Sequence, residues 1–263
     1  MMTVLRHELR QARNALIIWA ASIGFLMVIC ILLFPEMKGE MEGVSDIFAS
    51  MGSFTAAFGM DRLAFGELRG FYAVECGNIL GLGGAFFAAL QAILVLAKEE
   101  KGRTAEFLLT HPLSRGAIVT GKLLGVFVQI VLLNLAVTAM AFLSMAFIGE
   151  EIPWKDILLL HGAYFLLQLE LAGICFGISA FLRRGGLGVG LGLAIMAYFL
   201  NIIANISDKA EFLKYITPFG YTEGADIFTS GSLEWDKVLI GMGLMAVGIV
   251  AGYFRYCTKD ITA

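Results

Sequence analysis

The sequence predicts an all-α protein that crosses a membrane six times. Of its 263 residues, 59% are hydrophobic and 16% are charged, whereas soluble domains have about 45–50% apolar and about 25% charged residues. A bilayer core requires about 20 consecutive apolar residues per helix. Six stretches meet this requirement, namely 15–34, 75–97, 123–148, 157–182, 187–206 and 238–256. We therefore expect a single transmembrane domain over residues 1–263.

The same composition excludes two other classes of protein. Four cysteines are too few for the disulfide framework of a small secreted scaffold. With a net charge of −3, the chain lacks the excess of positive charge that is typical of proteins that bind nucleic acid. We expect membrane lipid, and no nucleic acid, among the partners of the chain.

Basic residues are concentrated on one side of the predicted membrane. The N-terminus, residues 98–122, residues 183–186 and the C-terminus together hold 12 of the 19 Lys and Arg residues. By the positive-inside rule this side is the cytoplasm, and an even number of spans places both termini there. Arg6, Arg10 and Arg13 recur on one helical face, which predicts an N-terminal helix lying at the inner membrane interface or a simple basic flank.

The segment between the second and third spans carries an exposed apolar patch. It is predicted to be a short helix with Thr104 near its start, and Pro112 ends it. Phe107, Leu108 and Leu109 lie just outside the membrane and must be buried against lipid or a soluble partner. The charges on both flanks favour a partner.

Two motif-like patterns in this region do not fit an active site. Gly116, Gly121 and Lys122 have the spacing of a phosphate-binding loop, but Leu123 stands where Ser or Thr would reach Mg²⁺. No strand precedes the pattern, so we expect this chain to bind neither ATP nor another cofactor.

Glu99, Glu100 and Arg103 resemble the paired-glutamate motif of intramembrane proteases, with the arginine one residue too close. No H-E-x-x-H or G-x-S-x-G motif occurs in the chain. We therefore expect no catalytic residues and no metal ligands.

The whole segment also carries a longer pattern of residues. Its members are Glu99, Glu100, Gly102, Thr104, Glu106, Leu108, Leu109, Pro112, Ser114, Arg115 and Lys122. This pattern resembles that of the permease subunits of type-2 ABC transporters, the ABC-2 permease family. The similarity extends to the six-span layout, the N-terminal interfacial helix and the large loop after the first span. Arg103 stands between the Gly and the Thr that are adjacent in the family.

This resemblance implies that the chain is one subunit of a transporter complex in a bacterial plasma membrane. Two copies of a separate ABC ATPase would bind ATP and Mg²⁺ and dock on the coupling helix, residues 99–115. Phe107, Leu108 and Leu109 would enter a groove on the ATPase, with Glu106 and Arg115 paired at its rim. A second permease half, identical or different, would complete the pathway.

Polar residues inside the spans are the second place to look for function. Glu170 is the only ionisable residue that we expect deep in a span, where a charge costs about 2.5–3.5 kcal/mol. A substrate path and simple hydrogen bonding between helices remain alternatives for this set, which comprises Glu170, Asn134, Gln91 and Gln129. Asn201 and Asn205 lie near the outer end of the fifth span.

Glycines at a spacing of four residues indicate close helix packing in the spans. The pairs are Gly77 and Gly81, Gly173 and Gly177, Gly188 and Gly192, and Gly248 and Gly252.

The sequence as a whole favours the permease half of an ATP-driven exporter. Its substrate would be hydrophobic or amphipathic, such as a peptide antibiotic or a lipid-like molecule, or an ion. The alternative is a stand-alone secondary transporter or an intramembrane enzyme. Co-purification of an ATPase would separate these hypotheses.

Overall fold

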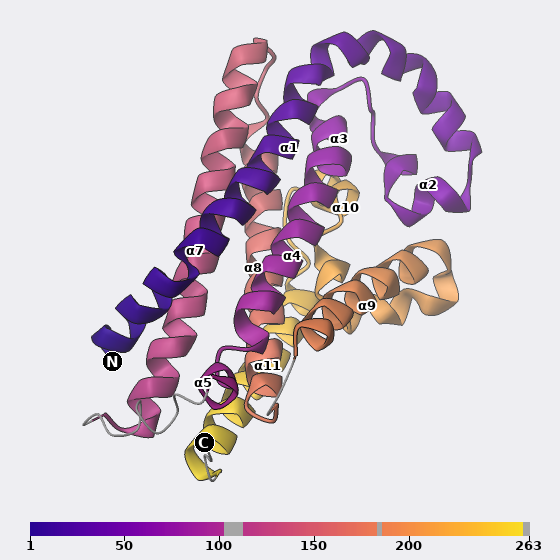
Figure 1. The fold of residues 1–263 in the computed structure, drawn as a ribbon. Helices are drawn as coiled ribbons and strands as arrows, with labels where there is room; N and C mark the ends of the chain where they lie inside the picture. The colour runs from indigo at the N-terminus through magenta and orange to yellow at the C-terminus, as the bar shows by residue number, and fades with distance from the viewer. Residues whose placement is uncertain (103–112, 183–185, 260–263) are drawn as a thin grey trace.

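A computed structural model describes residues 1–102, 113–182 and 186–259, without the side chains of 40–50, 53–54, 61 and 100–101. The described residues form helices and no strands. Within these described ranges, six helical segments are long and apolar enough to cross a membrane, which confirms the predicted all-α polytopic fold. Figure 1 shows both chain termini and α5 at one end of the bundle. We call this the terminal end and the opposite one the far end.

The long helices correspond to the six predicted spans. They are α1 (Met2–Ser50), α4 (Gly77–Ile93), α7 (Arg115–Ile148), α8 (Trp154–Ser179), α9 (Leu187–Ile206) and α11 (Trp235–Thr258). The second span is longer than α4, because α3 (Leu68–Phe71) and a π-helical turn, η2 (Tyr72–Cys76), lead into it without a break. It begins at Leu68 rather than at 75. Arg69 can be part of it because its guanidinium lies 2.9 Å from the carboxylate of Asp156.

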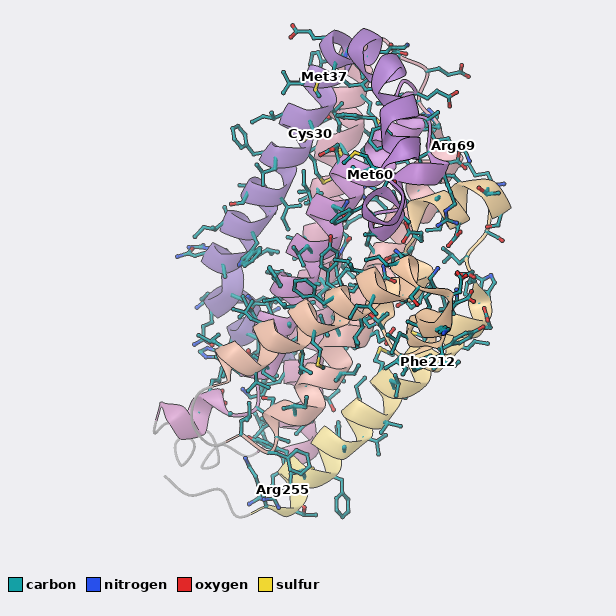
Figure 2. All side chains as sticks on the ribbon, turned by 90° about the vertical axis from the view of Figure 1, so that its right-hand side faces the viewer. Cys30, Met37, Met60, Arg69, Phe212 and Arg255 are labelled. Atoms are coloured by element: carbon teal, nitrogen blue, oxygen red, sulfur yellow. The ribbon has the colours of Figure 1, made fainter. Side chains whose placement is uncertain are left out.

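Short elements connect these helices. They are α2 (Ser53–Ala57), η1 (Met60–Arg62), α5 (Lys98–Lys101), η3 (Asp208–Tyr215), η4 (Pro218–Tyr221) and α10 (Gly224–Ser230). Figure 2 labels Met60 and Arg69 toward the far end, Phe212 on η3, and Arg255 at the terminal end.

The first helix differs from the prediction. A separate interfacial helix was expected before residue 15 and a loop after residue 34, but α1 is continuous from Met2 to Ser50. No proline occurs between Met2 and Phe34. Pro35 removes one backbone donor, yet the helix continues there, with the buried ring of Phe34 packed 5.1 Å from that of Phe71.

The start of α1 packs against α7 (Figure 1) because α7 has small residues there. A Cβ atom on Gly121 would lie 2.9 Å from the Cβ of Val4, and one on Gly125 would lie 2.8 Å from the Cβ of Glu8. Small residues allow such close approach between helices. The N-terminal turns are thus part of the bundle, and Val4 and Glu8 are buried in it.

Glycines also form the seam between α8 and α11. A Cβ on Gly177 would lie 2.4 Å from the carbonyl oxygen of Gly248, and one on Gly248 would lie 2.6 Å from that of Gly173. A Cβ on Gly252 would lie 3.1 Å from the Cα of Gly177. The predicted close packing of these two pairs is confirmed.

The other two predicted pairs behave differently from each other. Gly77 and Gly81 accommodate the ring of Tyr164 from α8, which agrees with close packing. Gly188 and Gly192 have no described atom within 4 Å of a Cβ built on them. The prediction for this last pair is wrong within the described part of a single chain, because their face of α9 points away from the other helices.

The segment between α9 and α11 folds back onto the bundle. Pro218, Phe219 and Tyr221 of η4 are buried. Thr217 donates its hydroxyl to the carbonyl of Ala197 in α9 at 2.7 Å. The ring of Phe219 lies 5.3 Å from that of Tyr198. This segment therefore forms one wall of the far half of the bundle.

Candidate functional site

The structure describes the two flanks of the predicted coupling helix. Gly102 is exposed directly after α5, and Glu100 lies within α5. Half of the predicted docking residues lie outside the described residues, namely Thr104, Glu106, Phe107, Leu108, Leu109 and Pro112.

Four charged side chains meet where the coupling segment leaves the second span. We call Glu8, Lys98, Glu99 and Lys122 the terminal ionic cluster. Lys122 is 0% exposed, and its ammonium group donates to Glu99 Oε1 at 2.5 Å and to Glu8 Oε1 at 3.2 Å. It also donates to the carbonyl of Val95 at 2.8 Å. These three acceptors match the three donors of a lysine ammonium.

Lys98 completes the cluster from α5. Its ammonium group donates to the second carboxylate oxygen of Glu8 and, at 2.6 Å, to Gln11. Burial lowers the pKa of Lys98, and the nearby charge of Lys122 lowers it further, while Glu8 opposes both effects. The cluster therefore joins α1, α5 and α7 through paired charges, of which Glu8 and Lys122 are buried and Lys98 and Glu99 are partly buried.

The other flank of the coupling segment is bound to the last helix. Ser114 caps the start of α7 by accepting a hydrogen bond from the backbone N–H of Ala117 at 3.2 Å. Arg115 donates to the carbonyls of Cys257 at 3.2 Å and Lys259 at 2.7 Å. The expected partner of Arg115, Glu106, lies outside the described residues, so that pairing stays a prediction.

Of the four predicted path residues, Asn134 lies between α7 and α8. Asn134 donates to Gln168 Oε1 at 2.7 Å and to the carbonyl of Ile130 at 2.8 Å. Gln129 is buried, and its Oε1 has no hydrogen-bond partner in the described part of the chain. Gln91 is partly exposed on α4.

Glu170 reaches a residue that the sequence reasoning did not connect with it. It is 1% exposed and accepts a hydrogen bond from the hydroxyl of Tyr221 in η4 at 2.9 Å. A Cβ on Gly241 of α11 would lie 2.0 Å from Glu170 Oε2, so the glycine makes room for the carboxylate. Among the described residues, no hydrogen bond joins Glu170, Asn134, Gln129 and Gln91 to one another.

Glu170 is not the only ionisable residue inside a span. His161 of α8 is buried, with Nε2 2.6 Å from the hydroxyl of Tyr72 and Nδ1 2.8 Å from that of Thr138. His161 was not among the polar residues expected inside the spans. A histidine within an apolar stretch was the signal for it in the sequence.

A second polar group lies in the far half of the bundle and was not expected from the sequence. A cavity of about 40 Å³, enough for a few water molecules, is lined by Glu223, Asn201, Asn78, Tyr164 and Tyr198 among others. We call it the far pocket. It lies between α4, α8, α9 and the segment that follows η4.

Glu223 is the charged group of the far pocket. Its Oε2 accepts a hydrogen bond from Asn205 at 2.9 Å. In the described part of the chain, no Lys or Arg forms an ion pair with it. Burial raises the pKa of Glu223, and the hydrogen bond from Asn205 opposes this effect.

Asn201 provides a second acceptor in the same pocket. Its side chain is 8% exposed, and its Oδ1 has no hydrogen-bond partner among the described residues. Tyr198 donates its hydroxyl to Asn78 Oδ1 at 3.2 Å. Asn201 and Asn205 are one helical turn apart on α9, and this spacing in an apolar span was the sequence signal that could have located the pocket.

The comparison with protein families agrees with the fold. The family model described as ABC-2 family transporter protein matches residues 2–261. No curated protein matches the chain. The match covers nearly the whole chain, and six membrane helices fit a six-span permease. Members of this family are membrane subunits for transport and are not themselves catalytic. The chain therefore belongs to the ABC-2 family of transporter proteins and is a permease subunit of an ABC transporter.

Proposed function

We propose that the chain forms half of an export pathway for a hydrophobic or amphipathic substrate, driven by a separate ABC ATPase that docks on residues 99–115. Two ATPase copies would hold ATP and Mg²⁺, and both termini of the permease would face the cytoplasm of a bacterial cell. The observation that carries this proposal is the terminal ionic cluster, because it attaches the predicted docking segment to two spans at once.

The cluster is suited to transmit a displacement into the membrane. Glu99 is bonded to Lys122 of α7, and Lys98 to Glu8 of α1. A buried ion pair is costly to separate, because each ion would be left desolvated without its partner. A force applied by the ATPase to α5 therefore moves α1 and α7 with it.

The second flank transmits the same displacement to α11. Arg115 holds the carbonyls at the end of α11, and Tyr253 donates its hydroxyl to the carbonyl of Gly116 at 2.8 Å. Lys259 in turn donates to the carbonyl of Ala180, just after α8, at 3.3 Å. Both ends of the docking segment are thus linked to spans that line different sides of the bundle.

A second permease half has a surface on α9 on which it could pack. Gly188 and Gly192 are spaced for close helix contact and have open space beside them in the described part of the chain. Whether the second half is another copy or a sister chain, the substrate would pass between the halves. Glu170, Asn134, Gln91 and Gln129 stay our proposed path residues, and the unpartnered buried acceptor of Gln129 supports this role.

The experiment that tests the proposal uses two acidic substitutions in the docking segment. Leu108→Asp combined with Leu109→Asp would prevent burial of the apolar patch against the ATPase. We expect the variant to insert into membranes at the wild-type level, to lose the co-purifying ATPase and to abolish the permease-dependent stimulation of ATP hydrolysis.

The matched control is Phe212→Asp with Ile216→Asp, which places the same two charges on exposed residues of the segment between α9 and α11. It should retain the ATPase and its stimulation. Normal co-purification and stimulation with the variant at residues 108 and 109 would contradict the docking assignment.

A further inference from the structure

The far pocket contains two acceptor groups whose hydrogen bonding is incomplete among the described residues. Glu223 provides a carboxylate whose described hydrogen bond comes from Asn205 alone, and Asn201 provides a buried amide oxygen without a partner. Buried acceptors of this kind are costly unless a donor reaches them. The cavity that both side chains line is therefore ready to accept a ligand that brings N–H donors.

The nearby basic side chains form no ion pair with Glu223 among the described residues. Arg62 of η1 pairs with Asp226 of α10. Arg62 and Lys214 oppose the effect of burial on the pKa of Glu223. The described residues therefore leave the carboxylate of Glu223 without an ion-pair partner.

We propose that the far pocket binds the protonated primary amine of an amphipathic molecule, with Glu223 and Asn201 as the groups that accept its hydrogen bonds. The inference rests on the proposed function and deepens it, because it names the head group that the substrate carries. An ammonium group offers three N–H donors and a positive charge, and so satisfies both acceptors at once.

The walls of the pocket fit such a head group. The rings of Tyr164, Tyr198 and Phe219 line it, and aromatic faces attract cations. The cavity of about 40 Å³ has room for an ammonium group but not for an alkyl chain. Leu82 and Ile202 line the same cavity and provide apolar surface beside the polar groups.

Gly59 preserves the position of the carboxylate. Its φ of +66° lies in the left-handed region that favours glycine, and a Cβ there would lie 1.9 Å from Glu223 Oε1. Any larger residue at position 59 would displace the Glu223 carboxylate from the place where it lines the cavity.

Binding of octylammonium to the full-length chain in phosphatidylcholine nanodiscs tests the proposal. Phosphatidylcholine has no primary amine, so the probe has no competitor in the bilayer. We expect saturable binding of radiolabelled octylammonium. Octanol should not compete because it has no charge, and octyltrimethylammonium should compete weakly because it has no N–H donor.

Two substitutions should weaken this binding. A hydrogen bond to a charged group contributes substantially to the free energy of binding. Glu223→Gln and Asn201→Leu should therefore each reduce the affinity for octylammonium by about tenfold or more. The control is Glu211→Gln, which removes one negative charge from an exposed position on η3. It should bind octylammonium as the wild type does.

Replacing part of the bilayer with phosphatidylethanolamine identifies the source of the amine. Displacement of octylammonium would support a lipid amine, and no displacement would support a free amphipathic amine. Unchanged binding in folded Glu223→Gln or Asn201→Leu, or equal competition by octanol, would overturn the proposal. The assay contains no ATPase, so absent binding together with normal ATPase co-purification would refute this inference while the proposed function stands.

Discussion

The two polar groups at opposite halves of the bundle differ in how their charges are compensated. In the terminal ionic cluster, Lys122 has three acceptors for its three donors, and Lys98 has two acceptors of its own. In the far pocket, Glu223 and Asn201 expose acceptors that the described residues leave partly unsatisfied. A cluster in which each charge has an ion-pair partner holds helices together. A pocket whose acceptors have too few donors is suited to bind a ligand reversibly.

This difference indicates that the terminal ionic cluster has a structural role and that the far pocket has a ligand-binding role. Breaking the terminal cluster exposes buried charge without a partner, so its geometry is retained when the docking segment moves. A cationic ligand in the far pocket would give Glu223 an ion-pair partner. The occupancy of the pocket by this ligand can therefore change during transport. The comparison predicts stability effects at the terminal end and ligand effects at the far end.

The largest effect is expected when the terminal cluster loses its central cation. Lys122→Met leaves Glu8 and Glu99 buried without that partner, and loss of one member of a buried ion pair costs about 3–5 kcal/mol. Thermal unfolding in detergent measures the loss. Lys155→Met, at an exposed lysine, should unfold like the wild type.

Adding Glu99→Gln to Lys122→Met should recover part of the lost stability, since it removes the carboxylate left without a lysine, whereas Glu8 keeps its bond to Lys98. An unfolding temperature of Lys122→Met equal to that of the wild type would show that the cluster does not hold the helices together.

A smaller effect is expected at the seam between α8 and α11, which connects the two ends. Gly248→Ala would bring a Cβ to 2.6 Å from the carbonyl of Gly173, and overpacking of this kind costs about 1–3 kcal/mol. Gly243→Ala on the same helix meets no described atom within 4 Å and serves as the control. Equal unfolding temperatures for the two variants would contradict the predicted seam.

The smallest effect concerns pH and the far pocket. Burial raises the pKa of Glu223 above its ordinary value of 4.5, against the opposing effects of Asn205, Arg62 and Lys214, while Asp226 adds to the rise. Lowering the pH through this raised pKa neutralises the carboxylate and should weaken octylammonium binding by up to about tenfold per pH unit. Binding titrations at several pH values measure the slope.

The raised pKa of Glu223 also makes the stability of the folded protein depend on pH. The folded state holds the proton of Glu223 more tightly than the unfolded state, so this group contributes stability below pH 4.5 that is lost as pH rises through the raised pKa. Glu223→Gln should remove both dependences. A pH slope for octylammonium binding that persists in Glu223→Gln would assign it to another group.

The sequence predicted the spans because hydropathy and length are local properties. Residues 187–206 match α9, and residues 157–182 differ from α8 by a few residues at each end. The continuation of α1 through Pro35 was not predicted, because it depends on packing of Phe34 against a distant part of the chain. Propensity rules treat a proline as a break, and tertiary contacts can override them.

The candidate sites depended on long-range contacts that the sequence does not display. Lys122 was identified from the family resemblance, but its bond to Glu8 joins residues 114 positions apart. Glu223 looked like an ordinary loop carboxylate, because only the return of η4 to α9 places it beside Asn205. The sequence placed Asn201 and Asn205 near the outer end of the fifth span, and the fold was needed to show what surrounds them.

The most direct test of the coupling scheme is site-specific photo-crosslinking in native membranes. A photoreactive residue at position 108 should form a covalent adduct with an ABC ATPase. The same residue at Phe147, which is 83% exposed near the other end of α7, should form none. An ATPase adduct at 108 alone is the predicted result, and no adduct at 108, or equal adducts at both positions, would contradict the account.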